Sequence, residues 1–134
     1  TYSLSILTPE KIAFQGQVYS IIVPGADGYL EILTQHAPLM ALIQPGKLTL
    51  TDQNQQKHIY AVSIGILEVS QNHANILVDA IESVENIDLQ RAQSAYERAN
   101  ARVHSHDQNV DVMRAKQALQ RAENRIKIYQ EAQR

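Results

Sequence analysis

The chain is predicted to be an α+β protein, with an N-terminal antiparallel β-sandwich or barrel over residues 1–84 and a C-terminal antiparallel two-helix hairpin over residues 85–134. Two observations predict this division. All prolines and glycines precede residue 85, whereas every arginine follows it. Short β-type runs separated by turn signals fill the first part, and a tandem repeat with helical spacing fills the second.

The first part contains apolar runs with the length and alternation of strands. The predicted strands are Tyr2–Leu7, Val18–Val23, Tyr29–Leu33, Leu39–Ile43, Lys47–Thr51, Lys57–Val62, Ile64–Val69 and Ala74–Val78. A turn is expected at Thr8–Lys11, and two hairpins are expected across Asp52–Gln56 and Ser70–His73. Strands at this spacing are typical of a small sandwich or barrel. Because alternate faces are apolar, this unit is expected to bury its own core without the helices.

The second part repeats itself, because Ile87–Arg102 and Val110–Arg125 match at corresponding positions. Each copy begins with an aspartate, Asp88 or Asp111, whose short side chain can accept bonds from the free N–H groups of a first helical turn. The residues that follow are good helix formers without glycine or proline. The polar linker Val103–Asn109 separates the copies, so the repeat predicts a helical hairpin.

Two stripes run along each predicted helix, one of alanine and one of arginine. The alanines are Ala92, Ala95, Ala99, Ala115, Ala118 and Ala122, and the arginines are Arg91, Arg98, Arg102, Arg114, Arg121 and Arg125. An alanine seam lets helices approach closely but removes little surface from water, since each buried CH₂ contributes only ~0.8 kcal/mol. Two interpretations stay open: a stable hairpin with solvated arginines, and a detachable hairpin with two cationic faces.

The overall composition excludes several classes of protein. A chain of 134 residues can hold one domain with an appendage. Its net charge of -2 and pI of about 6.2 argue against a nucleic-acid binder driven by bulk charge. The absence of cysteine excludes disulfides and thiolate metal sites. No apolar run approaches the ~18 residues of a membrane span and no secretory signal opens the chain, so a soluble intracellular protein is expected.

Catalytic chemistry finds little support in the sequence. His104 and His106 could form part of a metal site, but the spacing places no further ligand, so no metal is expected. His36 precedes Ala37-Pro38, which favours a hydrogen bond that orients the loop over a general base. Gly25–Gly28 lacks the lysine and the following helix of a phosphate loop. No catalytic residues are predicted, and an enzyme is not expected.

A resemblance to a known family rests on motifs spread along essentially the whole chain. They are Gly28-Tyr-Leu-Glu-Ile-Leu-Thr-Gln-His-Ala-Pro-Leu39, Gln44-Pro-Gly46, Gly65-Ile-Leu-Glu-Val69, Ile76-Leu-Val-Asp-Ala80 and Ile87-Asp-Leu-Gln-Arg-Ala92. In this order they resemble the ε subunit of F-type ATP synthases, and His-Ala-Pro-Leu at 36–39 with the later Asp-x-x-Arg-Ala is the most diagnostic combination. Glu31, Thr34, Ile64 and Ile66 depart from the usual pattern of that family.

This resemblance implies a non-catalytic subunit of the central stalk, which helps couple ion flow, such as hydrogen ion transport, to ATP synthesis. It implies that the sandwich attaches to the γ subunit and rests on the c-ring, at the cytoplasmic face of an energy-coupling membrane, such as the bacterial plasma membrane. It also implies that the hairpin folds down on the sandwich or extends along γ. The extended form would contact the α and β catalytic subunits, block rotation and inhibit ATP hydrolysis, and charge-assisted arginine–carboxylate pairs suit such a reversible contact.

Some bacterial members of this family bind a regulatory ATP at the folded hairpin, although no cofactor is required. The residues that match their motif here are Glu82, Asp88, Arg91, Ala92, Arg121 and Arg125. Carried over, the three arginines would grip phosphates, and the two acids would contact the base, the sugar or the arginines. The alternative is that Asp88 is only a helix cap and that the arginines serve the inhibitory state.

Two other functions remain as alternatives at the level of the whole chain. One is a free-standing β-sandwich that binds a small ligand or a partner and carries a helical tail. The other is an enzyme, which would need a convergent cluster of titratable residues that the sequence does not supply.

Overall fold

The computed structural model describes residues 1–107 and 109–132 of the chain. The chain divides into two compact units, Thr1–Ser83 and Val84–Arg134, the first built of strands and the second of helices. The predicted α+β class is therefore confirmed. Residues 108, 133 and 134, which the predicted linker and hairpin include, lie outside the described residues.

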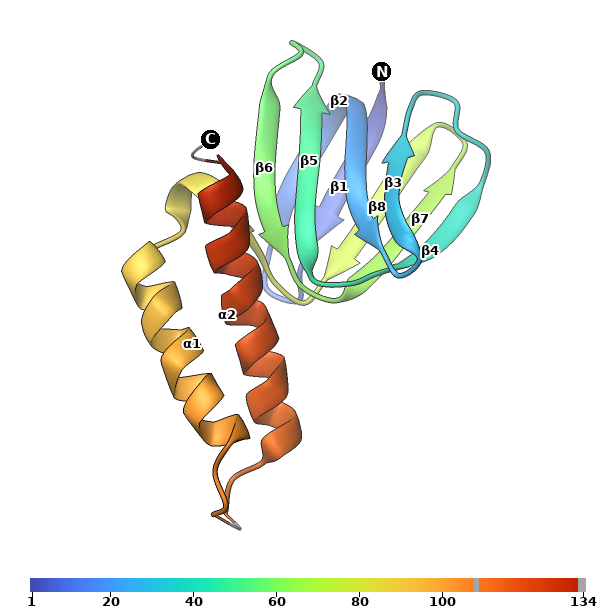
Figure 1. Ribbon diagram of the computed structural model, residues 1–134. Coiled ribbons are helices and arrows are strands. Elements are labelled where there is room, and N and C mark those ends of the chain that lie inside the picture. Colours follow the sequence, from blue (N-terminus) through green and yellow to red (C-terminus); the bar gives the residue numbers. More distant parts are fainter. Residues whose placement is uncertain (108, 133–134) are drawn as a thin grey trace. The chain divides into compact units, whose positions relative to one another are not determined.

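The unit Thr1–Ser83 is a β-sandwich (Figure 1). Its strands are β1 (Tyr2–Leu7), β2 (Ile12–Gly25), β3 (Gly28–Ile32), β4 (Leu39–Ile43), β5 (Gly46–Asp52), β6 (Lys57–Val62), β7 (Gly65–Ser70), β8 (His73–Val78) and β9 (Ile81–Ser83). The predicted bounds are reproduced for β1, β4 and β6, and are shifted by one residue at one or both ends for β3, β5, β7 and β8.

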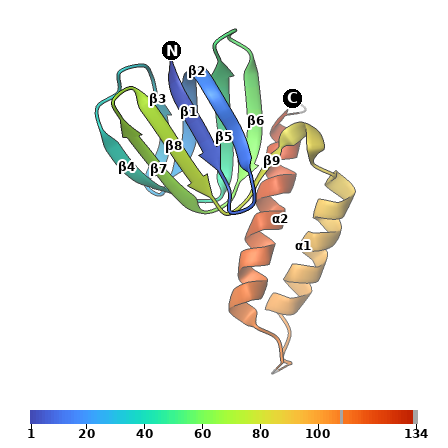
Figure 2. The same cartoon turned by 180° about the vertical axis from the view of Figure 1, so that it is seen from behind.

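The strands follow the order β1-β8-β7-β4-β2-β5-β6-β9, with β3 beside β2. Strand β1 also pairs with β2, so the sheet returns on itself (Figure 2). The β1–β8 pair is parallel, and it aligns Ser3 with His73 and Leu7 with Leu77. Both predicted hairpins are present, because β5–β6 and β7–β8 are antiparallel neighbours.

The sandwich encloses one core of large aliphatic side chains. In several strands alternate residues point inward, as in β1, where Leu4 and Ile6 are fully buried, and in β5, where Leu48 and Leu50 are. Every buried member of this cluster belongs to the unit Thr1–Ser83. The expectation that this unit supplies its own core is therefore confirmed.

Two parts of the sheet differ from the prediction. Strand β2 begins at Ile12 instead of Val18, because residues 12–18 pair with β1 and are shifted by a bulge next to Leu7. The short β9 is an additional strand that pairs with the end of β6. Neither segment shows clear alternation in the sequence, and both are extended because a neighbouring strand supplies their hydrogen bonds.

The unit Val84–Arg134 begins with a short 3₁₀ turn, Val84–Asn86, and continues with α1 (Leu89–Val103) and α2 (Val112–Ala132). The two helices run antiparallel and side by side (Figures 1 and 2). Each has an aspartate cap, as predicted: Arg91 N donates to Asp88 Oδ1 over 3.1 Å, and Arg114 N donates to Asp111 Oδ1 over 3.1 Å.

The seam between α1 and α2 consists mainly of alanine. Ala92 and Ala99 of α1 are buried, as are Ala115 and Ala122 of α2. Ala95 and Ala118 are half-buried, so the predicted alanine stripe is confirmed as the contact surface of the hairpin. Larger buried side chains of this unit lie near its chain ends, at Ile87 and Ile128.

Candidate functional site

The candidate nucleotide residues of the helical unit lie at the start of α1 and in the middle and second half of α2. Asp88 caps α1, and Arg91 and Ala92 lie in its first turn, whereas Arg121 lies at the middle of α2 and Arg125 in its second half. Because the helices are antiparallel, the start of α1 lies beside the end of α2 (Figure 1). The antiparallel pairing therefore places the first turn of α1, with Arg91, beside the half of α2 that contains Arg125, and Arg121 stands one helical turn before Arg125.

The side chains in this group differ in their surroundings. Arg91 and Arg121 are exposed, and Arg125 is half-buried. The Asp88 carboxylate is exposed and serves as the cap of α1. Ala92 is fully buried in the seam, so its contribution to any site here is to let the two helices approach closely. Glu82, the sixth candidate, belongs to the other unit, where it is half-buried on β9 opposite Ala61 of β6.

The remaining arginines extend the positive charge along both helices. Arg98 and Arg102 of α1 and Arg114 of α2 are exposed. The sequence of α1 includes three arginines and only one acidic residue, Glu97. This excess of guanidinium groups suits anionic partners, either phosphates or carboxylates, because arginine presents paired donors to both.

A second candidate surface lies on the outer face of the sandwich. Leu42 of β4 is opposite Ile66 of β7, Ile66 is opposite Leu77 of β8, and Leu77 is opposite Leu7 of β1. We call these four residues the apolar row. Leu42, Ile66 and Leu77 have exposed fractions of 64%, 40% and 50%.

Further apolar side chains adjoin the apolar row. Met40 lies two residues before Leu42 on β4, and Ile64 lies two residues before Ile66, just ahead of β7. Both side chains are exposed. Exposed apolar residues of this size in contiguous positions mark a binding surface more often than they mark ordinary protein surface.

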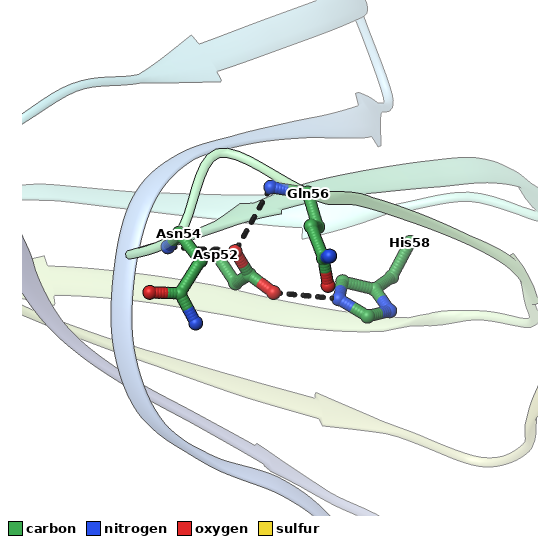
Figure 3. Close-up of polar contacts among 4 residues, drawn as sticks. All are labelled: Asp52, Asn54, Gln56 and His58. Carbon is green, nitrogen blue, oxygen red and sulfur yellow. Dashed lines mark hydrogen bonds and ion pairs between the residues drawn. The ribbon is translucent and has the colours of Figure 1, made fainter.

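A polar cluster holds the turn between β5 and β6 (Figure 3). The backbone N–H groups of Asn54 and Gln56 donate to Asp52 Oδ1 over 2.8 and 2.9 Å, and His58 Nε2 lies 2.9 Å from Asp52 Oδ2. The hydrogen bond from His58, followed by that from Gln56, lowers the pKa of Asp52 below its ordinary value. The cluster fixes a hairpin turn, and it contains no third side chain placed to ligate a metal.

Two of the histidines lie within hydrogen-bond distance of nearby backbone carbonyls. His36 Nδ1 lies 2.7 Å from the carbonyl of Ala37, and the ring therefore orients its loop by a hydrogen bond. His104 Nδ1 lies 2.8 Å from the carbonyl of Asn100 at the end of α1. Within residues 1–107 and 109–132, no group of three or more potential ligands is placed to hold a metal ion.

Comparison with known sequences identifies the family. The description "ATP synthase, Delta/Epsilon chain, beta-sandwich domain" fits residues 1–84, and "ATP synthase, Delta/Epsilon chain, long alpha-helix domain" fits residues 85–130. The chain belongs to the ATP synthase delta/epsilon chain family. An ε-type chain is a stalk subunit and not a catalytic subunit, so the family resemblance and the expectation of a non-catalytic protein are both confirmed.

Individual relatives of the delta/epsilon family cover most of the chain. The ATP synthase epsilon chain of Protochlamydia amoebophila is 54% identical over 107 residues, which are 80% of this chain and 73% of that protein. The ATP synthase epsilon chain of Moorella thermoacetica is 40% identical over 101 residues, 75% of each protein.

Solved structures share the fold of this delta/epsilon chain at low sequence identity. A chain of the Euglena gracilis mitochondrial ATP synthase matches with a TM-score of 0.80 and 23% identity, over 97% of this chain and 79% of that chain. A chain from the central stalk and c-ring of the Tetrahymena thermophila mitochondrial ATP synthase matches with a TM-score of 0.59 and 16% identity, over 98% of this chain and 96% of that chain.

A membrane span made of a helix requires that the helix be both long and apolar. Within the part of the chain that the structure describes, neither α1 nor α2 combines the length and the apolar character that a transmembrane helix needs.

The sequence reasoning missed the apolar row as a surface. A signal for it was present, since Leu39–Ile43 is apolar at every position and Gly65–Val69 places Ile66 on the face opposite to Leu67. A strand with one solvated face should alternate, so a continuous apolar run is the signal that the outer face carries apolar side chains as well. The Asp52–His58 pair was also missed, because its members are joined by the register of a hairpin.

Proposed function

We propose that this chain is a central-stalk subunit of an F-type ATP synthase, whose sandwich over residues 1–84 attaches to the γ subunit and rests on the c-ring. The observation that carries the proposal is the apolar row. Its side chains gain ~1.5–3 kcal/mol each when fully removed from water, and a central patch without charged residues is typical of a protein–protein interface. In this position the subunit acts at the cytoplasmic face of an energy-coupling membrane and helps couple hydrogen ion transport through the c-ring to ATP synthesis.

The attachment to γ is tested with Leu77→Lys in the full chain. Leu77 is half-exposed in the middle of the row, so the substitution leaves the core intact but places a charge in the interface. Affinity for the γ subunit of the same enzyme should fall at least about thirtyfold, as for a central interface residue worth ~2 kcal/mol. Tyr19→Lys is the control, because Tyr19 is similarly exposed but lies outside the row.

The outcome of this experiment separates the stalk subunit from the alternative function. If the unsubstituted chain stays monomeric with γ at micromolar concentrations, the protein is a free-standing binding module and the stalk proposal fails. If Leu77→Lys and Tyr19→Lys weaken binding equally, γ does not bind at the apolar row.

We also propose that the helical hairpin over residues 85–134 is a regulatory element that changes between a folded and an extended position. The alanine seam supports this, because it gives the two helices a close contact that buries little apolar surface and is readily exchanged for a better one. In the extended position along γ, the exposed arginines would pair with acidic surfaces of the α and β subunits. Such contacts would block rotation and inhibit ATP hydrolysis.

The inhibitory role is tested by ATP hydrolysis in the assembled enzyme. The double variant Arg98→Gln, Arg102→Gln should raise the hydrolysis rate severalfold, because two charge-assisted contacts are lost. The matched control is Lys116→Gln, Lys127→Gln, which removes the same charge from exposed positions outside the arginine stripe. Equal rates for both double variants would leave no role for the arginine stripe.

The same hairpin is proposed to bind a regulatory ATP in its folded position. Arg91, Arg121 and Arg125 would hold the phosphates, Glu82 and Asp88 would contact the base, the sugar or an arginine, and Ala92 would keep the seam close. The antiparallel hairpin supports this proposal, since it sets the start of α1 with Arg91 beside the part of α2 with Arg121 and Arg125, and phosphate binding needs convergent donors. The capping role of Asp88 is compatible with it, because a cap uses only part of a carboxylate.

Thermal unfolding with millimolar ATP tests the regulatory site in the isolated chain. Ligand that binds only the folded state raises the unfolding temperature, and saturation at a hundred times Kd stabilises by ~2.7 kcal/mol. Arg121→Ala should abolish the ATP-dependent rise, whereas Arg98→Ala, an exposed arginine further along α1, should preserve it. If ATP leaves the unsubstituted chain unchanged, the regulatory site does not exist.

A further inference from the structure

A polar cluster on the sandwich ties together three segments that are far apart in the sequence. Its centre is Asn72, in the turn between β7 and β8. Gln35 N donates to Asn72 Oδ1 over 2.7 Å, and Asn72 Nδ2 donates to the carbonyl of Thr1 over 3.3 Å. The Thr34 hydroxyl lies 3.1 Å from the Thr1 carbonyl and 3.3 Å from Asn72 Oδ1, and can donate its one proton to either.

The backbone around Asn72 supports the same arrangement. Gln71 and Asn72 have φ of 50° and 57°, and they form a two-residue loop between the paired residues Ser70 and His73. Such left-handed pairs make the hairpin turn whose twist suits adjacent strands, and asparagine tolerates this conformation better than most residues. The turn aims the Asn72 side chain at Gln35, itself at a φ of 56°.

The segments joined by Asn72 lead into the strands that carry the apolar row. Gln35 lies in the connection from β3 to β4, Thr1 precedes β1, and Asn72 connects β7 with β8. Ser3 N also donates to the carbonyl of Asn72 over 3.4 Å, and the buried Tyr2 hydroxyl donates to the carbonyl of Ile32 over 2.6 Å. The connection from Leu33 to Pro38 lies between β3 and β4, and these bonds tie it to the starts of β1 and β8.

We propose that Asn72 is a positioning residue that holds the connection before β4 against the starts of β1 and β8, so that the apolar row and Met40 are presented to the γ subunit in one arrangement. This inference rests on the proposed attachment of the row to γ. Releasing the connection would leave residues 33–38 to be ordered during binding. Fixing the backbone of even one of these residues during binding would lower the affinity roughly tenfold.

The test uses Asn72→Gly, because glycine keeps the left-handed turn while it removes the side chain. Affinity for the γ subunit should fall roughly tenfold, and the Gln35 amide should exchange faster. Asn72→Asp keeps the acceptor for Gln35 N and should retain an affinity within about threefold of the unsubstituted chain. Gln71→Gly makes the same backbone change one residue earlier and should bind γ as the unsubstituted chain does.

Three outcomes would contradict the positioning role of Asn72, and a fourth would contradict the proposed function. If Asn72→Gly binds γ normally although the Gln35 amide exchanges faster, the positioning role is wrong. It is also wrong if Gln71→Gly weakens binding equally, or if Asn72→Asp is no better than Asn72→Gly. If the unsubstituted chain itself has no affinity for γ, the proposed function fails, and the exchange rate of the Gln35 amide still shows whether Asn72 holds the connection.

Discussion

The sandwich and the helical hairpin both bury apolar side chains, but those of the sandwich are large and those of the hairpin are mainly alanine. The sandwich encloses leucine, isoleucine and valine from eight of its strands, and many of them have no exposed surface. The hairpin closes on four buried alanines, with Ile87 and Ile128 towards one end. A fully buried leucine or isoleucine contributes ~1.5–3 kcal/mol, whereas an alanine methyl contributes about a third of that.

The hairpin buries less apolar surface than the sandwich, so it is the part of the chain that can change its structure at low cost. Local opening takes place where few apolar contacts are buried, and elements that move in regulation come from this low-stability class. We therefore expect the amides of α1 and α2 to exchange with solvent through openings that leave the sheet intact. If hairpin amides exchanged as slowly as those of β5 and β7, the hairpin would be a static spacer.

The largest effect in this comparison is expected from Leu67→Ala in the sandwich core. Leu67 is fully buried on β7, so the substitution removes apolar contacts and leaves a cavity. The free energy of unfolding of the sandwich should fall by ~3 kcal/mol, within the usual range for leucine in a core. Hydrogen exchange of β5 amides measures it, and exchange in α1 should stay unchanged, because Leu67 belongs to the sandwich cluster. A parallel loss of protection in α1 would show that the two units unfold together.

A smaller effect is expected from Ala99→Leu in the hairpin seam. Ala99 is buried in α1, and a larger side chain there should force the helices apart at a cost of ~1–3 kcal/mol. Ala101→Leu is the matched control, because Ala101 is exposed on the same helix. Exchange of α2 amides should accelerate for Ala99→Leu only. Unchanged exchange in both variants would mean that the seam accommodates a leucine side chain at position 99 without moving the helices apart.

The sequence predicts the hairpin more completely than the sandwich. Its caps, seam and arginine faces depend on residues three, four or seven apart, and helix geometry alone brings such residues together. Asp88, Asp111 and the buried Ala92, Ala99, Ala115 and Ala122 are where the repeat predicts them. Local periodicity is enough when all contacts follow from one regular helix and one turn.

The missed features of the sandwich depend on register between distant strands. Residues 12–17 are extended because β1 pairs with them, and β9 exists because β6 offers it an edge. The apolar row becomes visible only when Leu42, Ile66 and Leu77 are aligned across three strands. Asn72 contacts Gln35 across 37 positions of sequence, which no local pattern encodes. The candidate nucleotide residues rest on the family motif, and the hairpin adds only that five of the six share one unit.

The caps provide the next prediction in order of size. Asp111→Ala removes the acceptor for Arg114 N at the start of α2 and should destabilise the helical unit by ~1 kcal/mol. Glu123→Ala is the control, because Glu123 is an exposed acid within α2 that does not cap the helix. Circular dichroism during thermal unfolding should show the loss in helical signal at a lower temperature. A loss confined to the sheet would contradict the assignment of this cap.

The smallest effect is expected at Asp52, in the turn between β5 and β6 of the sandwich. Its pKa is lowered in the folded chain, by the hydrogen bond from His58 first and by that from Gln56 second, whereas in the unfolded chain it is about 3.9. The folded state therefore binds fewer protons than the unfolded state. The carboxylate stabilises the turn above pH about 4 and loses this contribution as the pH falls through the lower, folded pKa.

Asp52→Asn should reduce the unfolding temperature of the sandwich near pH 6, and the difference from the unsubstituted chain should shrink as the pH falls below about 4. His58→Ala should bring the pKa of Asp52 closer to its unfolded value, because it removes the largest cause of the lowered pKa. The pH range over which this carboxylate adds stability should therefore become narrower. A difference between Asp52→Asn and the unsubstituted chain that stayed constant from pH 3 to pH 7 would mean that shape, and not the charge of this carboxylate, stabilises the turn.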